Sequence, residues 1–282
     1  MKNNIKLICI DMDGTLLNSN HEVTEENKLI LQKAFAKGIR IVLCTGRIFM
    51  SARYYSDLIG IKNAPVIASN GAYIKNGYTD KAIYENPMPK DLVLEIYSII
   101  KRYGLKINFN SWNTLFRIDK EPSYHTYYKM NKLVSSDKRI NFIINEDLEE
   151  SIRNFDGEIL KGIVIEQDNV DTLWKAKAEL KELYGDKLHI VSSGADNFEI
   201  MLGSSSKGNA VSFIAKSFNI DPSEVMCIGD SENDLSMIEF AGIGVAMGNG
   251  LDLLKEAADY ITDTNDNSGV SKAIKKFALE NN

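Results

Sequence analysis

Short apolar runs alternate with amphipathic segments at both ends of the chain. Residues 5–10, 39–44 and 225–229 are rich in Ile and Val, and continuous apolar runs of this length are typical of strands buried on both faces. Residues 24–38 instead place apolar side chains at helical spacing, with Thr24 as the candidate N-cap. Residues 207–219 show the same helical pattern. This alternation predicts an α/β fold built on a doubly wound sheet of parallel strands.

The pattern changes in the middle of the chain. Strand-like runs are there interleaved with longer amphipathic segments such as residues 89–104 and 169–184. The strand-like runs are residues 105–110, 114–119 and 160–167. We therefore expect residues 84–193 to form a second α/β domain, inserted into a core made of residues 1–83 and 194–282.

Composition narrows the class of protein. The 282 residues carry 33 basic and 39 acidic side chains, a formal net charge of -6, and no long block of Lys or Arg, which argues against nucleic-acid partners. No stretch approaches the roughly 20 apolar residues of a membrane helix, so we expect no membrane partner and a cytoplasmic location. Cys9, Cys44 and Cys227 lie in or beside apolar runs and are predicted to be reduced core thiols.

Two acidic residues stand where the first apolar run ends. Asp11 and Asp13 are separated only by Met12, and two neighbouring carboxylates repel unless a counter-charge relieves them. Mg²⁺ would do so, because it binds oxygen ligands such as carboxylates, phosphate and water. The alternative is a turn that opens a loop, which Gly14 and Thr15 would suit equally well.

Other runs also end in polar residues. Asp230, Asn233 and Asp234 follow one run, and Thr45 and Gly46 follow another. Ligands of open α/β sheets bind beyond the carboxyl ends of the strands, so these side chains should converge on one rim. Lys207 stands at the start of a predicted helix, where a cation opposes the helix dipole but suits a bound phosphate.

Taken in order, these segments resemble the four motifs of the haloacid dehalogenase (HAD) superfamily. The segments are DMDGT from Asp11, TGR from Thr45, Lys207, and GDSENDLSM from Gly229. The insertion after ASNGA and the return segment from Phe198 to Ala210 are similar to the Cof-like phosphatases, which carry the larger α/β cap. The resemblance implies that residues 84–193 are a cap that selects the substrate.

The resemblance also implies a mechanism. Asp11 would be the nucleophile that forms an aspartyl-phosphate, and Asp13 the general acid and base. Mg²⁺ would be held by the Asp11 carboxylate, the backbone carbonyl of Asp13, and Asp230. The phosphoryl oxygens would be bound by Thr45, Lys207, Asn233 and the backbone amides of Met12 and Gly46. Two supporting residues complete the set: Asp234 would orient Lys207 or a metal-bound water, and Arg47 would either reach the substrate or pair with a core carboxylate.

These roles predict a phosphatase acting on small phosphate monoesters, such as a sugar phosphate, a nucleotide or a cofactor phosphate. An aspartate at position 13 favours phosphatase or phosphomutase chemistry, because members of the superfamily that preserve the aspartyl-phosphate, such as the ion-pumping ATPases, carry threonine there. A phosphomutase is the alternative enzyme, and it requires a second basic cluster in the cap. The candidates are Lys101, Arg102, Lys129, Lys132, Lys138 and Arg139, for which solvated helix faces are the simpler interpretation. A non-catalytic phosphate-binding regulator is the third possibility.

Aromatic residues of the inserted block are the remaining candidates for substrate contact. Tyr124, His125, Tyr127 and Tyr128 cluster in one segment, for which an amphipathic helix with inward-packed rings is the favoured interpretation. Trp112 stands in a predicted turn between two strands and is a candidate contact between the insertion and the core. Neither the leaving group of the substrate nor the oligomeric state follows from these patterns.

Overall fold

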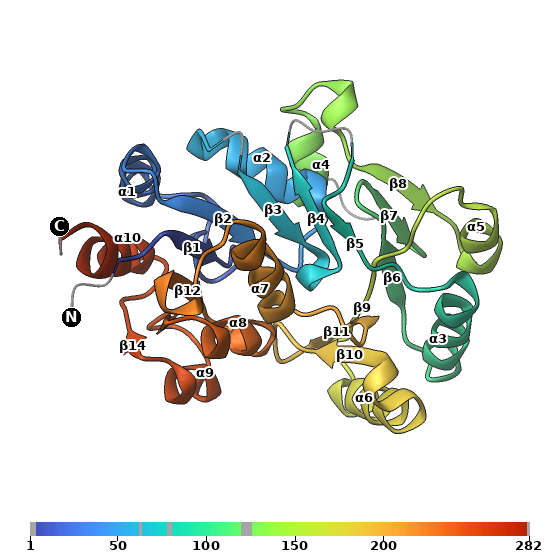
Figure 1. Cartoon of the computed structure of the whole chain (residues 1–282). Coiled ribbons are helices and arrows are strands. Elements are labelled where there is room, and N and C mark those ends of the chain that lie inside the picture. Colours follow the sequence, from blue (N-terminus) through green and yellow to red (C-terminus); the bar gives the residue numbers. More distant parts are fainter. Residues whose placement is uncertain (1–3, 62–63, 78–80, 120–125, 281–282) are drawn as a thin grey trace.

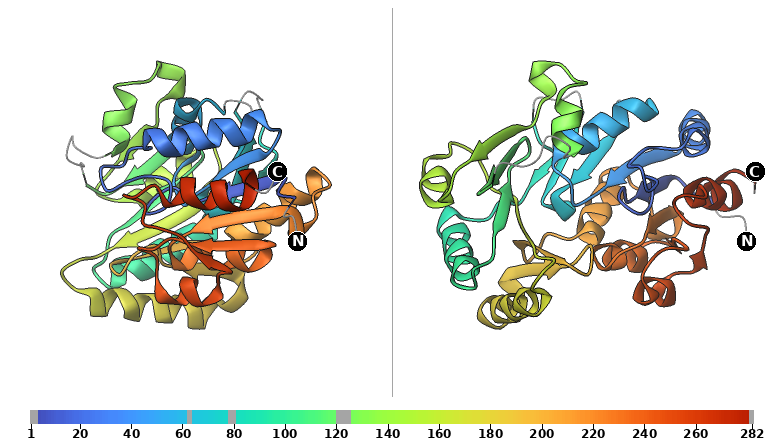
Figure 2. Two further views of the ribbon diagram at one scale, coloured as in Figure 1. Left: turned by 90° about the vertical axis from the view of Figure 1, so that its left-hand side faces the viewer. Right: turned by 180° about the vertical axis from the view of Figure 1, so that it is seen from behind.

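The computed structural model describes residues 4–61, 64–77, 81–119 and 126–280. Its strands form two sheets, an eight-stranded one in the core and a six-stranded one in the inserted cap. The two sheets lie at opposite ends of the molecule, with helices α1 and α10 together at the end of the core farthest from the cap (Figures 1 and 2).

The core sheet has the order β14-β13-β12-β1-β2-β3-β4-β5. Its strands are Leu7–Ile10 (β1), Arg40–Cys44 (β2), Pro65–Ala68 (β3), Tyr73–Asn76 (β4), Tyr84–Glu85 (β5), Val225–Gly229 (β12), Ile243–Ala246 (β13) and Tyr260–Ile261 (β14). The core helices are Glu25–Ala36 (α1), Phe49–Ile59 (α2), Lys207–Ser217 (α7), Leu235–Phe240 (α8), Asp252–Ala257 (α9) and Gly269–Ile274 (α10), which continues as a π-helical turn, Lys275–Leu279.

Helices cover both faces of the core sheet, as the sequence predicts. Successive side chains of β1 point to opposite faces: Ile8 and Ile10 pack in a cluster with α1, α2 and α10, whereas Leu7 and Cys9 pack with α7, α8 and α9. Strands β14 to β3 are parallel. The antiparallel strands β4 and β5 were not predicted, and they follow a turn, Ser69–Gly71, in which all three residues have positive φ.

The cap sheet has the order β10-β11-β9-β6-β7-β8. Its strands are Ile107–Asn110 (β6), Thr114–Arg117 (β7), Asn141–Ile144 (β8), Lys161–Ile165 (β9), Leu188–Val191 (β10) and Asn197–Leu202 (β11). The cap helices are Lys90–Arg102 (α3), Thr126–Asn131 (α4), Leu148–Asn154 (α5) and Val170–Tyr184 (α6).

One face of the cap sheet packs on helices, and the other lines a cavity. Phe109 of β6 and Phe198 of β11 are buried in a cluster with residues of α3, α5 and α6. Their sequence neighbours Asn108, Asn197 and Glu199 line the cavity on the opposite face. The period-2 alternation of strands thus gives the cap an apolar side and a side that faces the core.

The chain crosses between core and cap at residues 86–88 and again at residues 203–206. Asn86 joins the two crossings, because its Nδ2 donates to Ser204 Oγ at 2.7 Å and to Ser205 Oγ at 2.8 Å. We expected the insertion to comprise residues 84–193. Strand β5, at the start of that range, pairs with β4 and lies in the core sheet. Strand β11, which follows the end of that range, pairs with β9 and β10 and lies in the cap sheet.

Two further expectations concern the whole chain. Cys9, Cys44 and Cys227 are buried free thiols in three strands of the core sheet. Among the helices of the described ranges, none is both long enough and apolar enough to cross a membrane.

Candidate active site

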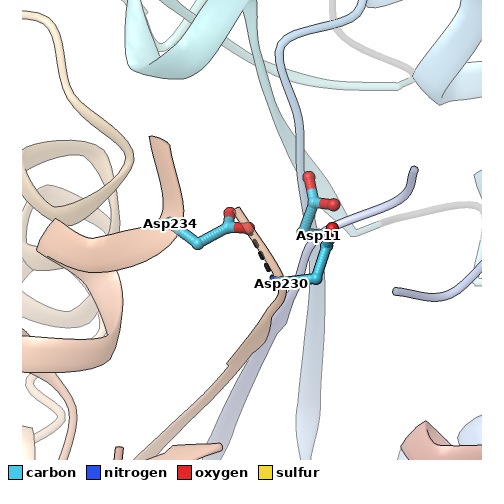
Figure 3. Close-up of side chains that lie close together, drawn as sticks. All are labelled: Asp11, Asp230 and Asp234. Atoms are coloured by element: carbon cyan, nitrogen blue, oxygen red, sulfur yellow. Dashed lines mark hydrogen bonds between the residues drawn. The ribbon is translucent and has the colours of Figure 1, made fainter. Parts of the chain in front are cut away.

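Three carboxylates meet where β1 and β12 end. These strands are neighbours, with Ile10 opposite Ile228, so Asp11 and Asp230 leave the sheet side by side. Oxygen atoms of Asp11, Asp230 and Asp234 lie within 4.8 Å of one another (Figure 3). The predicted convergence of these acids on one rim is therefore present in the structure.

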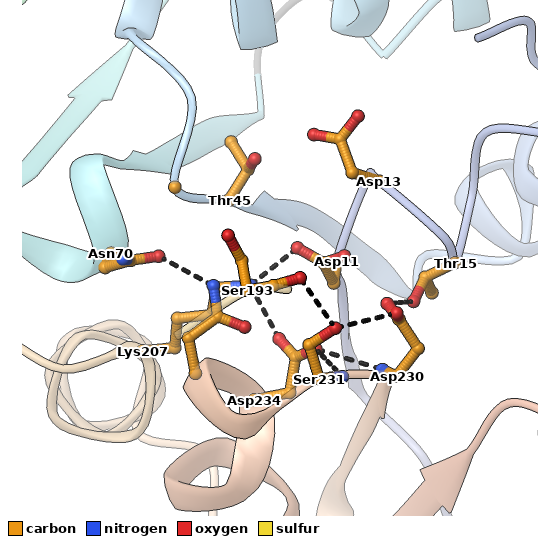
Figure 4. A network of polar contacts seen from close by, with 12 residues as sticks. Asp11, Asp13, Thr15, Thr45, Asn70, Ser193, Lys207, Asp230, Ser231 and Asp234 are labelled. Carbon is orange, nitrogen blue, oxygen red and sulfur yellow. Dashed lines mark hydrogen bonds and ion pairs between the residues drawn. The ribbon is translucent and has the colours of Figure 1, made fainter. Parts of the chain in front are cut away.

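Lys207 is the cation of this cluster. It is the first residue of α7, as the sequence predicts, and its side chain is fully buried. Its Nζ lies 2.5 Å from Asp11 Oδ1 and 2.6 Å from Asp234 Oδ1 (Figure 4). Although burial alone would lower the pKa of Lys207, the two carboxylates hold that pKa well above its usual range. Asp234 thus orients Lys207, which is one of the two roles expected for it.

Hydrogen bonds fix the remaining carboxylate of the cluster. Asp230 Oδ1 accepts from Thr15 Oγ1 at 2.7 Å, and Asp230 Oδ2 accepts from Ser231 Oγ at 2.8 Å. Burial, and next the charge of Asp234, raises the pKa of Asp230 to about 6. Burial and the charge of Asp234 also raise the pKa of Asp11 well above its usual range.

The charges and donor atoms of this cluster fit Mg²⁺. Three carboxylates lie close together, and Lys207 is ion-paired with two of them, Asp11 and Asp234. Burial, and after it the charge of Asp234, raises the pKa of both Asp11 and Asp230, so a cation bound there would favour their ionised forms. All of the oxygen donors are hard ligands of the kind that Mg²⁺ prefers. Asp11 and Asp230 are the better candidates. Asp11 lines the cavity, and Asp230 accepts hydrogen bonds from two neutral hydroxyl groups, whereas Asp234 is held by the ammonium group of Lys207 and by two backbone N–H groups.

Asp13 points away from the acidic cluster and pairs with Arg47. The guanidinium binds it in a bidentate fashion, with Nε 2.7 Å from Asp13 Oδ2 and Nη2 2.5 Å from Asp13 Oδ1. Although burial acts to raise the pKa of Asp13, the charge and hydrogen bonds of Arg47 hold that pKa well below its usual range. Of the two roles expected for Arg47, the structure shows pairing with a carboxylate.

A cavity of about 570 Å³ lies between this rim and the cap. Six of the predicted site residues line it from the core: Asp11, Asp13, Thr45, Gly46, Arg47 and Asn233. The other four do not line the cavity in the described part of the chain: Met12, Lys207, Asp230 and Asp234. The buried Lys207 reaches the cavity through its contact with Asp11.

The cap contributes amide, apolar, aromatic and basic groups to the same cavity. They include Asn108, Asn110, Leu115, Arg117, Tyr127, Ile163 and Ile165. Tyr127 lines the cavity and also packs against the apolar cluster of the core, so its ring packs inward as expected while remaining open to a bound substrate. The ring of Tyr128 stacks on that of Phe142, with centroids 4.2 Å apart. Tyr124 and His125 lie outside the described residues.

Trp112, a candidate contact between the insertion and the core, does contact the core. Its ring centroid lies 6.3 Å from that of Phe49 in α2 and 4.7 Å from the ammonium group of Lys75. The backbone carbonyl of Trp112 also accepts a hydrogen bond from the N–H of Met50. The turn between β6 and β7 thus docks on the core beside the cavity.

Comparisons with known proteins agree with this geometry. The profile of the haloacid dehalogenase-like hydrolases matches residues 8–274. The chain belongs to this family. Phosphatase YwpJ of Bacillus subtilis is 31% identical over 289 residues, covering 96% of this chain and 99% of its own. The 5-amino-6-(5-phospho-D-ribitylamino)uracil phosphatase YcsE of the same organism is 32% identical over 277 residues, covering 98% of this chain and 96% of its own.

Solved structures lead to the same family. A HAD-like hydrolase from B. subtilis superposes with a TM-score of 0.84 and 29% identity, covering 98% of this chain and 100% of its own. A HAD-like hydrolase from Bacteroides thetaiotaomicron superposes with a TM-score of 0.81 and 28% identity, covering 96% of this chain and 99% of its own. These findings confirm the predicted HAD core and the expectation of a phosphoric monoester hydrolase.

Sequence reasoning missed three buried polar residues of this HAD-like hydrolase: Asn70, Lys161 and Glu199. Lys161 and Glu199 line the cavity from the cap, and Asn70 follows β3 in the core. A signal for Glu199 was present, because it interrupts an apolar strand run just as Asp11 ends one. Asn70 follows an apolar run, just as Thr45 does. The expectation that polar residues after such runs lie at the site would have selected Asn70 as well.

Proposed function

We propose that this HAD-like hydrolase is a Mg²⁺-dependent phosphatase that cleaves small phosphate monoesters through an aspartyl-phosphate. The observation that carries the proposal is the position of Asp11, which lines the cavity while Lys207 binds one of its oxygens. Asp13, which lines the same cavity, is the second carboxylate that such chemistry needs. Splitting the hydrolysis into two displacements at phosphorus lowers the barrier of each.

In the first displacement, a carboxylate oxygen of Asp11 forms a bond to phosphorus while the bond to the ester oxygen breaks. Asp13 donates a proton to the departing alkoxide. In the second, Asp13 takes a proton from a water molecule whose oxygen attacks phosphorus, and the bond to Asp11 breaks. Because Arg47 favours the ionised form of Asp13, part of this pairing must be released before Asp13 donates its proton.

Binding of the phosphoryl group follows from the same arrangement. Thr45, Lys207 and Asn233, with the backbone amides of Met12 and Gly46, would bind the phosphoryl oxygens, so that charge compensation and positioning supply most of the catalysis. Asp11, Asp230 and the backbone carbonyl of Asp13 would hold Mg²⁺, which neutralises charge on the phosphoryl group.

The cap favours a phosphatase over a phosphomutase. None of the six basic cap residues considered from the sequence lines the cavity in the described part of the chain. Instead, Lys101 pairs with Asp147 and Arg102 with Glu179. Arg117 and Lys161 do line the cavity, but Lys161 is paired with Glu199. The second basic cluster that a mutase requires has therefore not been found among the described cap residues.

Purified protein with Mg²⁺ and p-nitrophenyl phosphate provides the direct test. We expect turnover that requires Mg²⁺ and disappears in Asp11→Asn. Asp13→Asn should slow breakdown of the intermediate, so that mass spectrometry detects phosphate on Asp11. No turnover by the wild-type protein, or full activity in chelator, would contradict the proposal.

A panel of phosphate monoesters would then identify the substrate class. The panel should include 5-amino-6-(5-phospho-D-ribitylamino)uracil, because YcsE is named for that activity, together with sugar phosphates and nucleotides. One dominant specificity constant would define the substrate, and a flat ranking would indicate broad activity. A cytoplasmic location and the absence of nucleic-acid partners stay predictions.

A further inference from the structure

A buried ion pair of the cap lies directly against the candidate phosphate-binding loops of the core. Lys161 of β9 is 5% exposed and Glu199 of β11 is 4% exposed. Lys161 Nζ lies 2.7 Å from Glu199 Oε1. Both side chains project from the cap face that lines the cavity.

Each member of the pair also contacts the core. Lys161 Nζ donates a hydrogen bond of 2.5 Å to the backbone carbonyl of Gly46. Glu199 Oε2 accepts a hydrogen bond from Asn70 Nδ2. Asn70 Oδ1 in turn accepts from Asn233 Nδ2 at 3.2 Å. The pair thus contacts one candidate phosphate-binding loop directly and the other through a single residue.

Asn70 is itself fixed between these loops. Its backbone adopts φ 53°, a left-handed conformation that asparagine tolerates better than most residues. Its N–H donates to the carbonyl of Thr45 at 3.0 Å. Thr45 Oγ1 also accepts from the N–H of Arg47 at 3.1 Å. The residues after β2 and β3 are therefore joined by hydrogen bonds, and Glu199 of the cap accepts a hydrogen bond from one of them, Asn70.

Close packing leaves little freedom at this contact. A Cβ atom at Gly46 would lie 2.9 Å from Asn70 Oδ1 and 3.0 Å from Glu199 Oε2. Glycine is thus needed at position 46 for the carboxylate to approach the loop. Small movements of the pair would be transmitted to the loop, because closely packed groups cannot move independently.

The ion pair of Lys161 and Glu199 is expected to contribute little to the free energy of unfolding. Burying two charges carries a large desolvation penalty, and replacing a buried pair by apolar residues of similar volume is often neutral or stabilising. The contacts of the pair with Gly46 and Asn70 indicate a role other than stability. They connect the cap to the peptide groups and amide side chain proposed to bind phosphate.

We propose that Lys161 and Glu199 are positioning residues that hold the phosphate-binding loops in their binding geometry when the cap is docked. Lys161 orients the peptide group between Gly46 and Arg47, and Glu199 orients Asn233 through Asn70. The inference rests on the proposed function, because it takes these loops to bind the phosphoryl group. It adds that the cap acts on phosphate binding itself as well as on the choice of leaving group.

The test replaces both charges by apolar side chains of similar size. Lys161→Met combined with Glu199→Leu should fold, with a melting temperature near that of the wild type. We expect its affinity for inorganic phosphate, measured by calorimetry with Mg²⁺ present, to fall about tenfold or more, and its kcat for p-nitrophenyl phosphate to fall about 10- to 100-fold. Inorganic phosphate has no leaving group, so a loss of its affinity cannot come from lost contacts between the cap and a leaving group.

A matched control removes a cap ion pair that does not touch the core loops. Arg102 Nη2 lies 2.5 Å from Glu179 Oε1, with both residues on cap helices. Arg102→Met combined with Glu179→Leu should leave phosphate affinity and kcat unchanged. Lys161→Arg, which keeps the charge and several donors, should retain most of the phosphate affinity.

The outcomes separate the two proposals. Wild-type phosphate affinity and kcat in the Lys161 and Glu199 double variant would overturn the positioning role. If that variant does not fold, Glu199→Gln is the deciding variant. The two carboxylate oxygens of Glu199 accept from Lys161 and from Asn70, whereas the side chain of glutamine has one acceptor oxygen and one NH₂ donor, so one of these hydrogen bonds is lost. Unchanged phosphate affinity in Glu199→Gln would then overturn the positioning role. A wild-type protein that binds phosphate but hydrolyses no ester would refute the proposed function alone.

Discussion

Gly14→Ala probes how closely the backbone approaches the candidate metal site. Gly14 has φ 73°, and a Cβ atom there would lie 2.5 Å from Asp230 Oδ2 and 2.9 Å from Asp230 Cγ. Carbon and oxygen atoms in contact prefer separations about 1 Å longer than the first of these distances, so the Asp230 carboxylate would have to move. A shift of about 1 Å is half the length of a Mg²⁺–oxygen bond, and Mg²⁺ demands near-ideal geometry.

The chain offers a matched control for the backbone cost. Gly104, which follows α3, has φ 71° and no atom within 4 Å of a built Cβ. An alanine in this left-handed conformation costs about 1–2 kcal/mol of unfolding free energy. We expect Gly104→Ala to show this loss with unchanged Mg²⁺ dependence. Gly14→Ala should show a similar loss and, in addition, a Mg²⁺ concentration for half-maximal activity that is about 10- to 100-fold higher.

Urea unfolding in chelator and Mg²⁺ titration of p-nitrophenyl phosphate hydrolysis measure the two effects separately. The comparison isolates the close approach to Asp230, because the φ angles of the two glycines are nearly equal, 73° for Gly14 and 71° for Gly104. Equal Mg²⁺ dependence in Gly14→Ala and wild type would refute the reasoning. So would a comparable loss of Mg²⁺ affinity in Gly104→Ala.

Three further predictions follow from the charges of the site. Lys207→Met leaves buried carboxylates without their cation, so urea unfolding in chelator should show a loss of about 3–5 kcal/mol; a loss below about 1 kcal/mol would contradict this. Arg47→Met removes the charge that depresses the pKa of Asp13, so Asp13 should keep its proton to higher pH in the free enzyme. The basic limb of the kcat/KM profile, which reports the proton donor of the first displacement, should therefore move to higher pH, and an unmoved limb would argue against Asp13 as that donor. The pKa of Asp230 is raised from 3.8 to about 6, so its ionisation destabilises the metal-free fold as pH rises between these values. Mg²⁺ should therefore raise the melting temperature more at pH 7 than at pH 5. An equal rise at both pH values would count against Asp230 as a ligand.

Local sequence patterns were sufficient to predict the core and its rim. An apolar run of four or five residues followed by a polar one marks the end of a buried strand, wherever that strand lies in the sheet. Because parallel strands end at the same edge, Asp11, Thr45 and Asp230 could be placed together without knowledge of the strand order. Lys207 was likewise located from the start of its helix.

Contacts that depend on tertiary register could not be predicted in this way. Glu199 meets Asn70 only because β11 lies beside β9 in the cap sheet and the cap is docked on the core. The choice of Asp13 as partner of Arg47 depends on the path of two separate loops. The β4–β5 extension follows from positive φ at Ser69 and Asn70, which serine in particular gives little reason to expect.

The contact between Asn86 and Ser204 and Ser205 has an evolutionary consequence. It places the entrance and exit of the cap within one hydrogen bond of each other, which is the condition under which a domain can be inserted into a host loop with little disturbance. The core sheet therefore needs only a short bridge at this point, whatever lies beyond it. Replacing the cap at this junction would therefore change the residues that face the leaving group, while the strand ends proposed to bind and cleave the phosphate would remain unchanged.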